Sequence, residues 1–154
     1  MDHDVYSKVK EFKRKYPMTI AWRLKAHCRV VESFLNPDEK VTFAFAAQKN
    51  DNPLDVITTY VVVLTNKRLL LATKRVFFGY FYTSITPDLF NDLKVRMGIV
   101  WGKVIIDTLK EKVFLSNIQR EALDEIETQI SKYMMDEKKC YMQSKVWLLF
   151  FFFF

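Results

Sequence analysis

Two stretches in the first third of the chain place apolar residues at helical spacing. The first predicts a helix over residues 4–16, with lysines and an arginine on its other faces. Its apolar stripe consists of Val5, Val9, Phe12 and Tyr16. Pro17 ends this helix, because a residue before proline avoids the helical conformation, and can open a second one. The second stripe begins at Ile20 and predicts a helix that ends near Leu35.

From Val41 the period changes from helical to two, which indicates antiparallel strands. Asn66-Lys67 predicts a tight hairpin, and Gly98 predicts a turn between two strands. Gly102 falls inside a strand and indicates a bend or the close approach of another backbone. The pattern predicts seven strands, near residues 40–48, 55–64, 69–73, 76–84, 92–97, 99–107 and 111–115.

A third helix is predicted to begin at Ser116, with Gln119 in the capping-box position. Its apolar face, which we expect to pack on the strands, consists of Leu123, Ile126, Ile130 and Met134. The layout is therefore two helices, seven antiparallel strands and a final helix.

The chain ends in an uninterrupted apolar tail over residues 146–154, five of which are consecutive phenylalanines. Nine residues make about 14 Å of helix, too short to cross a bilayer. We hypothesise that the tail is a read-through of the stop codon into a T-rich transcription terminator, which requires an inverted repeat over the codons for residues 139–149. We predict a helical extension over residues 1–35, a domain over 36–135 and an apolar tail over 136–154, outside the fold.

Three segments carry a resemblance to a known family. They are Leu-Asn-Pro-Asp-Glu at 35–39, Leu-Thr-Asn-Lys-Arg-Leu at 64–69 and Ser-Ile-Thr at 84–86. Over residues 35–134 the chain resembles the bacterial pleckstrin-homology-like (PH-like) family often labelled YokE-like. The resemblance implies an α+β, mainly β fold, a seven-stranded antiparallel barrel capped by the C-terminal helix. It also implies a non-enzymatic, cytoplasmic binding or assembly module, and it supplies no functional residues.

Composition narrows the class of protein without naming a ligand. The chain has 154 residues, of which 50% are apolar and 27% charged, enough for one globular core. Two cysteines, Cys28 and Cys140, are too few for a disulfide scaffold and fit a reducing cytoplasm. The net charge is +6, and the excess of positive charge is largest near the N-terminus, where residues 1–35 contain eight Lys and Arg and four Asp and Glu.

The sequence points to no catalytic, metal or cofactor site. It contains no GxSxG, P-loop, HExxH or GxGxxG motif. Turn and loop positions explain the carboxylates Asp88, Asp92, Asp107 and Glu111. His27 and Cys28 are neighbours on a helix and point about 100° apart, so we expect His27 to be packed or hydrogen-bonded rather than a metal ligand.

Two classes of anionic ligand are disfavoured. The loop at 48–53 has one lysine beside Asp51, which cannot build a specific phosphoinositide cage. Lys74-Arg75 followed by aromatic residues at 76–82 resembles a nucleic-acid stacking surface. Seven strands are too many for an OB-fold, however, and alternating aromatics are expected to pack in the core, so nucleic acid is disfavoured.

Two functional hypotheses are left. The first is a protein-interaction or self-assembly module that takes a peptide or a second copy in a groove or along an exposed edge strand. The alternative is a peripheral membrane module that binds anionic lipid through the basic first helix, with the stripe of that helix in the lipid interface. Its candidate residues are Lys10, Arg14 and Lys15, with Lys74 and Arg75.

Overall fold

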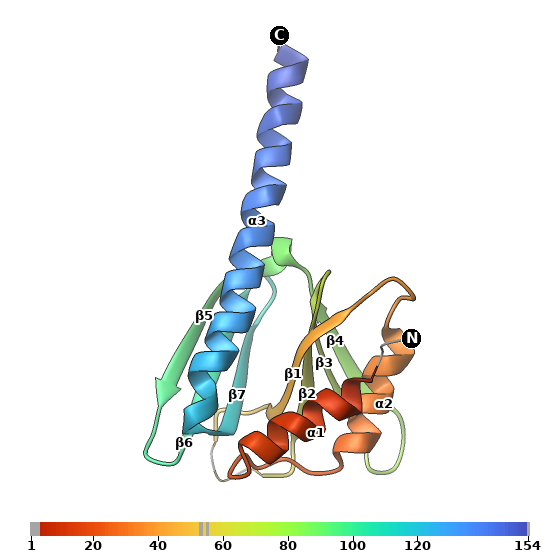
Figure 1. The fold of residues 1–154 in the computed structure, drawn as a ribbon, viewed down its shortest axis with the longest axis vertical. Helices are drawn as coiled ribbons and strands as arrows, with labels where there is room; N and C mark the ends of the chain where they lie inside the picture. Colours follow the sequence, from red (N-terminus) through yellow and green to blue (C-terminus); the bar gives the residue numbers. More distant parts are fainter. Residues whose placement is uncertain (1–3, 53, 55, 154) are drawn as a thin grey trace.

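The structure is a computed structural model that describes residues 4–52, 54 and 56–153. Two helices precede the strands and one long helix follows them (Figure 1). The helices are α1 (Val5–Lys15), α2 (Leu24–Phe34) and α3 (Leu123–Phe153). The strands are β1 (Val41–Gln48), β2 (Thr59–Thr65), β3 (Leu69–Lys74), β4 (Tyr80–Ile85), β5 (Phe90–Met97), β6 (Trp101–Thr108) and β7 (Lys112–Gln119).

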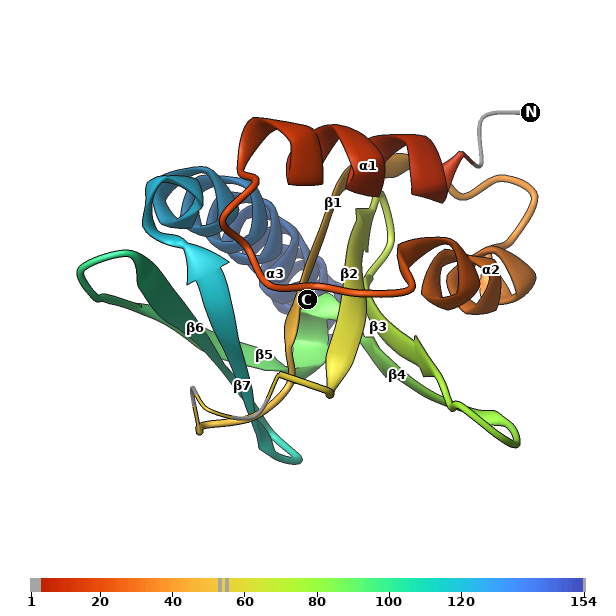
Figure 2. The same ribbon diagram turned by 90° about the horizontal axis from the view of Figure 1, so that it is seen from below.

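The seven strands form one antiparallel sheet in the order β4-β3-β2-β1-β7-β6-β5. The halves β1–β4 and β5–β7 meet where Gln48 of β1 pairs with Ser116 of β7, and they diverge from that point (Figure 2). The result is a curled half-barrel, with α3 packed against its concave side. The predicted fold of two helices, seven antiparallel strands and a C-terminal helix is confirmed.

Strands β1 to β3 are buried on both faces. On one face, Phe45 and Leu71 pack with Leu115 and Ile126 in the core beneath α3. On the other face, alternate residues of the same strands, such as Val63, pack against α1 and α2. This double burial explains why these strands read as nearly continuous apolar runs.

The α1 helix contributes residues to both of these apolar clusters, one on each face of the sheet. The Asp4 side chain caps its start by accepting a hydrogen bond from the Ser7 backbone N–H (2.9 Å). Val5 and Val9 face α2 and the sheet, whereas Phe12 contacts Phe43 and Phe45. The predicted stripe is therefore buried in the domain, and the division at residue 35 stays a prediction.

The second helix starts later than predicted. Residues 17–23 form a non-helical linker that starts with a turn, and α2 begins at Leu24 after Arg23, which adopts a left-handed conformation (φ 52°). Hydrogen bonds to β7 hold the linker: the Ile20 N–H donates to the Asn117 carbonyl (2.9 Å), and the Thr19 hydroxyl accepts from the Gln119 N–H (2.9 Å). These tertiary bonds replace the helical ones that the stripe from Ile20 predicted.

The start of the third helix was also predicted too early. Ser116 and Gln119 belong to β7, and α3 begins at Leu123. Asn117 has a positive φ of 59°, which a helix cannot include, and the Ser116 hydroxyl bonds to Asn50 across the sheet (2.9 Å). The residues that resemble a capping box, Ser116 and Gln119, therefore form the bent end of β7.

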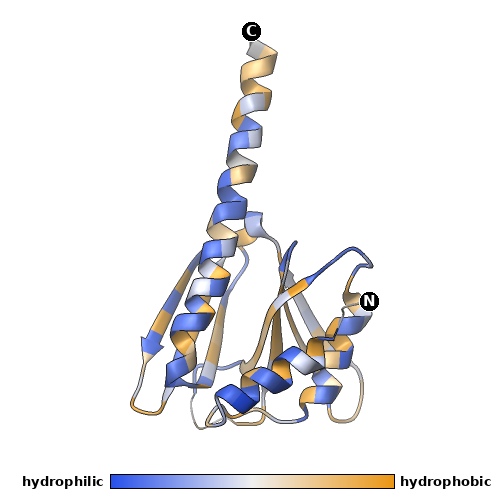
Figure 3. Ribbon diagram, in the orientation of Figure 1, coloured by the Kyte–Doolittle hydropathy of each residue, from blue (hydrophilic) through white to orange (hydrophobic). Residues whose placement is uncertain are grey.

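Met134 is the last core residue of α3, and one turn later the Lys138 ammonium donates to the Phe90 carbonyl of β5 (2.8 Å). From there α3 leaves the domain and runs on to Phe153 (Figure 1). Its side chains from Val146 to Phe152 are exposed, and hydrophobic residues gather toward its end (Figure 3). None of the helices in the described part of the chain is long and apolar enough to cross a membrane.

The turn that carries the family resemblance has a structural role. Glu39 is buried, and its carboxylate accepts hydrogen bonds from Arg68 Nε (3.0 Å) and Nη2 (3.1 Å) and from the Thr65 hydroxyl (2.6 Å). Asn66 and Lys40 exchange two further bonds, one through the Asn66 side chain (2.8 Å) and one between backbones (3.0 Å). The β2–β3 turn is thereby fixed to the segment that enters β1.

Candidate functional site: the loop end and the β4 edge

Four connecting segments meet at one end of the molecule, the lower end in Figure 1. We call this end the loop end, and it consists of residues 16–23, 49–52, 54, 56–58, 75–79 and 98–100. The linker between α1 and α2 ties the other three together. The Trp101 indole donates to the Met18 carbonyl (2.6 Å), the Trp22 indole donates to the Val56 carbonyl (3.0 Å), and Arg23 donates to the Lys74 carbonyl (3.1 Å).

Large apolar side chains project from the loop end into solvent. The exposed fractions are 87% for Ile57, 87% for Phe77, 85% for Phe78 and 92% for Ile99. Before Met135, Leu109 is the one exposed large apolar side chain, among those the structure describes, that lies away from this end and its adjoining strands. The loop end is thus apolar, whereas the turns at the opposite end carry mixed charges such as the Asp38–Lys67 ion pair (2.6 Å).

The hairpin between β3 and β4 contributes the most exposed apolar residues. The prediction that aromatics at 76–82 pack in the core is wrong for Phe77 and Phe78 and also for Tyr80 and Phe81, which are about half exposed. The Arg75 N–H donates to the carbonyl of Gly79 (3.0 Å), whose positive φ of 74° closes the turn, so residues 76–78 form its tip. Tyr82, further along β4, does pack inward and stacks on Phe34 with ring centroids 4.0 Å apart.

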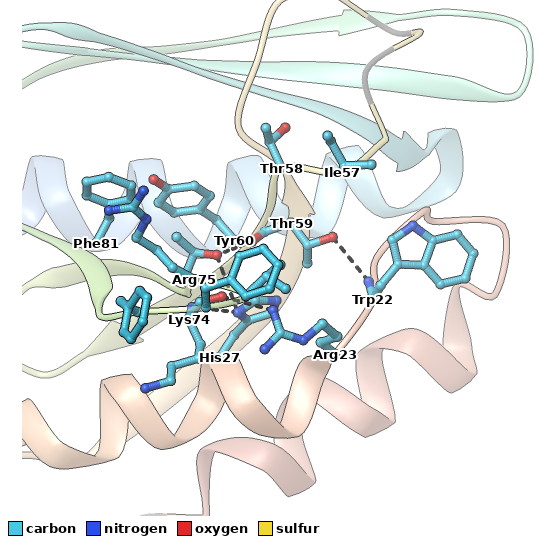
Figure 4. Close-up of a pocket in the computed structure, with 14 residues that line it drawn as sticks. Trp22, Arg23, His27, Ile57, Thr58, Thr59, Tyr60, Lys74, Arg75 and Phe81 are labelled. Atoms are coloured by element: carbon cyan, nitrogen blue, oxygen red, sulfur yellow. Dashed lines mark hydrogen bonds between the residues drawn. The ribbon is translucent and has the colours of Figure 1, made fainter.

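A groove of about 820 Å³ lies beside this hairpin (Figure 4). It runs between the start of α2, the start of β2 and the hairpin, and its lining combines exposed rings with three cationic side chains, Arg23, Lys74 and Arg75. The Arg75 guanidinium lies 5.1 Å from the centre of the Phe81 ring. Among the described residues that line the groove there is no carboxylate and no cysteine. The arrangement suits binding of an apolar or anionic group rather than acid–base chemistry.

His27 lies at the floor of the groove, and its ring already takes part in hydrogen bonds within the fold. Its Nδ1 accepts a hydrogen bond from the Lys74 backbone N–H (2.7 Å), and the Thr73 hydroxyl is 3.3 Å away. Burial, followed by the nearby charge of Arg23, lowers the pKa of His27 to about 4, so the ring is neutral near pH 7. The prediction of a packed, hydrogen-bonded His27 is confirmed. The described residues also bring together no cluster of three His, Cys, Asp or Glu side chains able to hold a metal.

The two terminal strands of the sheet differ in charge. Strand β4 has the sequence YFYTSI and carries no charged side chain, whereas β5 carries Asp92, Lys94 and Arg96. Charged side chains on an edge strand discourage pairing with another strand. The β4 edge, directly beside the groove, is therefore the edge that is open to strand addition.

The five candidate residues from the sequence fall into two separate groups. Lys74 and Arg75 lie in the groove, where they join Arg23, which sequence reasoning did not single out. Lys10, Arg14 and Lys15 lie on α1, and α2 lies between α1 and the β3–β4 hairpin (Figure 2). Lys15 forms an ion pair with Glu125 of α3 (3.1 Å). The apolar stripe of α1 is buried in the core, so this helix exposes its basic face but offers no apolar side chains of that stripe to a membrane.

Comparison with known proteins gives one family match and partial similarity to two solved structures. The family model for the bacterial PH domain matches residues 35–132. The solved structure of a DUF1696 family protein with a pleckstrin-homology domain from Shewanella loihica PV-4 is 18% identical, with a TM-score of 0.46 and coverage of 71% of this chain and 88% of that one. A pleckstrin homology domain from Shewanella amazonensis SB2B is 16% identical, with a TM-score of 0.43 and coverage of 69% and 83%. Among curated proteins, none matches.

Proposed function

The chain belongs to the bacterial PH domain family, and we propose that it is a non-catalytic module that binds an extended protein segment along the edge of β4. Membership of this family confirms the resemblance that the sequence carried, while the narrower YokE-like assignment stays a prediction. PH domains are in general binding modules without catalytic activity.

The observation that carries the proposal is the uncharged edge of β4. All six residues of β4 pair with β3 on one side, from Tyr80 opposite Lys74 to Ile85 opposite Leu69. On the other side β4 is the last strand of the sheet that the described residues form. An extended segment that adds to such an edge gains main-chain hydrogen bonds, and pockets for alternate side chains give specificity.

The groove beside β4 specifies the chemistry of the added segment. Arg23, Lys74 and Arg75 place three positive charges at the start of the strand, among the rings of Trp22 and Phe81. A segment with apolar side chains and one or two carboxylates complements this lining. The partner is therefore expected to carry an acidic, apolar strand, either in another protein or in a second copy of this chain.

Charge placed on the edge tests the proposal. Thr83→Lys puts a cation on β4, and Asn91→Lys puts the same charge on β5 as a matched control. If the occupant is a second copy, sedimentation velocity will show concentration-dependent association of the wild type and of N91K but not of T83K. Association that T83K leaves unchanged would place self-assembly elsewhere, for example at the apolar tail.

A further inference from the structure

We propose that the loop end inserts into the interface of an anionic lipid membrane. The partner differs from the protein segment proposed for the β4 edge, although the two surfaces share the groove residues Lys74 and Arg75. The alternative considered from the sequence placed membrane binding on α1, whereas the structure buries the apolar stripe of α1 and gathers exposed apolar residues at the loop end.

The same layering recurs in the three hairpins that reach the loop end. In the β3–β4 hairpin, the apolar tip at 76–78 follows the cations Lys74 and Arg75 directly. The β5–β6 hairpin has Ile99 and Val100 at its turn, with Arg96 and Lys103 behind them on the two strands. In the β1–β2 connection, Leu54 and Ile57 are exposed and Lys49 lies at its base. Apolar groups in front and cations behind match the order of acyl chains and anionic headgroups in a leaflet.

The charge of the loop end has one dominant sign. Within its four segments the described carboxylate is Asp51, which pairs with Lys103 (2.8 Å). Asp55 belongs to the same segment of the sequence but lies outside the described residues. Glu121, Asp124 and Glu125 follow on the adjoining segment, where Glu125 pairs with Lys15 (3.1 Å) and accepts a hydrogen bond from the Tyr16 hydroxyl, so cations still outnumber carboxylates. The cations of this end and its adjoining strands are Arg23, Lys49, Lys74, Arg75, Arg96, Lys103 and Arg120. A positive potential around apolar tips attracts an anionic membrane surface.

The shape of the loop end fits a lipid interface better than a protein surface. Its apolar side chains project from separate loops, and the most exposed of them are more than four-fifths accessible. A fluid interface accommodates each protruding tip independently, whereas a protein partner needs a fitted pocket for each one. The exposed tail of α3 projects from the other end of the molecule, opposite the loop end (Figure 1). The tail and the loop end therefore cannot enter the same flat membrane.

Co-flotation with vesicles tests the proposal on the full chain. The vesicles contain phosphatidylcholine alone or with phosphatidylglycerol. We expect binding that requires phosphatidylglycerol and weakens between about 0.1 M and about 1 M salt, where the Debye length falls from about 10 Å to about 3 Å. The double variant Phe77→Ser/Phe78→Ser should bind at least about tenfold more weakly. Leu109→Ser, which removes an exposed apolar side chain at the other end, should bind as the wild type does.

Charge variants compare the loop end with α1. Lys74→Glu/Arg75→Glu should abolish binding at low salt, while Lys10→Glu/Arg14→Glu, with the same change in net charge, should bind at least about half as well as the wild type because long-range attraction alone is reduced. The opposite pattern would return membrane binding to α1 and overturn the proposal. Absence of binding to phosphatidylglycerol vesicles at low salt would also overturn it and leave a protein as the partner of this end.

Three further measurements test the role of the tail, the insertion of the loop end and the folding of the variants. Phe151→Ser/Phe152→Ser should float normally, and flotation that depends on the tail alone would contradict the proposal. The variant Trp147→Phe retains Trp22 and Trp101, both near the loop end. Their fluorescence should be quenched by lipids with brominated acyl chains, and unquenched fluorescence of a bound chain would contradict insertion. Thermal unfolding of each variant confirms that it is folded.

Discussion

The Glu39 carboxylate has no exposed side-chain surface and is held by Arg68, Thr65 and the backbone of Asn36. Burial by itself would raise the pKa of Glu39, but hydrogen bonds from Arg68, Thr65 and Asn36 and the charge of Arg68 outweigh it and lower the pKa. Arg68 also donates to the Phe34 carbonyl at the end of α2 (2.9 Å). One buried ion pair therefore joins α2, the entry to β1 and the β2–β3 turn.

Breaking this pair on one side should be costly. Glu39→Gln leaves the Arg68 guanidinium, whose side chain is 19% exposed, without a counter-charge, which we expect to lower the free energy of unfolding by about 3 kcal/mol, the lower end of the range for buried pairs. The double variant Glu39→Met/Arg68→Met removes both charges and should cost less than Glu39→Gln alone. Urea denaturation measures both, and a double variant less stable than the single one would contradict this account.

The neutral state of His27 predicts a pH dependence of stability. The pKa of His27 is about 4 in the folded chain and about 6.5 when unfolded, so between these values the unfolded chain binds more protons. The free energy of unfolding should therefore fall as pH falls from about 6.5 to about 4, by up to about 3 kcal/mol from this group.

The variant His27→Asn isolates the contribution of this histidine. Its amide oxygen can replace Nδ1 as the acceptor for the Lys74 N–H, and it does not titrate in this range. Chemical denaturation at several pH values should give a shallower loss of stability for H27N than for the wild type. Equal slopes would show that His27 is not responsible.

At the scale of elements, the sequence predicted the strands better than the starts of α2 and α3. Alternation and turn residues located the β2–β3 hairpin at Asn66-Lys67 and the β5–β6 turn at Gly98, because these signals are local. The starts of α2 and α3 depend on tertiary hydrogen bonds between the 17–23 linker and β7, which no local pattern reveals. The capping signal at Ser116 was therefore misread.

The loop end was missed for a related reason. Its apolar residues come from four segments far apart in the sequence, and only the fold brings them to one end. A signal was nevertheless present, because Val76-Phe77-Phe78 and Ile99-Val100-Trp101 place three apolar residues in succession beside a turn glycine, where burial is difficult. Of the candidate site, Lys74 and Arg75 were found from the sequence, while Arg23 depended on the linker.

The α1 helix should be required for stability, because Phe12 packs against Phe43, Phe45 and Tyr16. Phe12→Ala should lower the free energy of unfolding by about 3–5 kcal/mol, as a buried phenylalanine lost from a core does. Glu11→Ala, one residue away and exposed, is the control and should be nearly neutral. Thermal denaturation compares them, and a small effect of F12A would show that α1 packs only loosely.

The close approach predicted at Gly102 is confirmed. A Cβ at this position would lie 2.8 Å from the Arg96 carbonyl oxygen and would also collide with the Leu123 side chain at the start of α3. Gly102→Ala should therefore destabilise the domain by about 1–3 kcal/mol, measured by urea denaturation. Unchanged stability would mean that the contact between β6 and α3 relaxes at little cost.

At the scale of the whole molecule, two proposed surfaces share the β3–β4 hairpin, whose tip at 76–78 also lines the groove beside β4. The hairpin tip points along the strands toward the loop end, whereas the free edge of β4 faces sideways in the sheet. A chain whose loop end lies in a membrane would thus hold the β4 edge close to that membrane and open to a partner. We infer that such an arrangement brings a protein segment to a lipid surface.

Site-specific photocrosslinking in living native cells tests the central proposal most directly. A photoreactive phenylalanine analogue replaces Thr83 on β4 or, as the control, Asn91 on β5. We predict a light-dependent adduct from position 83 and none from position 91. An adduct of about twice the 18.4 kDa chain mass would identify a second copy as the occupant, and any other mass would indicate a different protein. Equal adducts from both positions, or none from position 83, would contradict binding at the β4 edge.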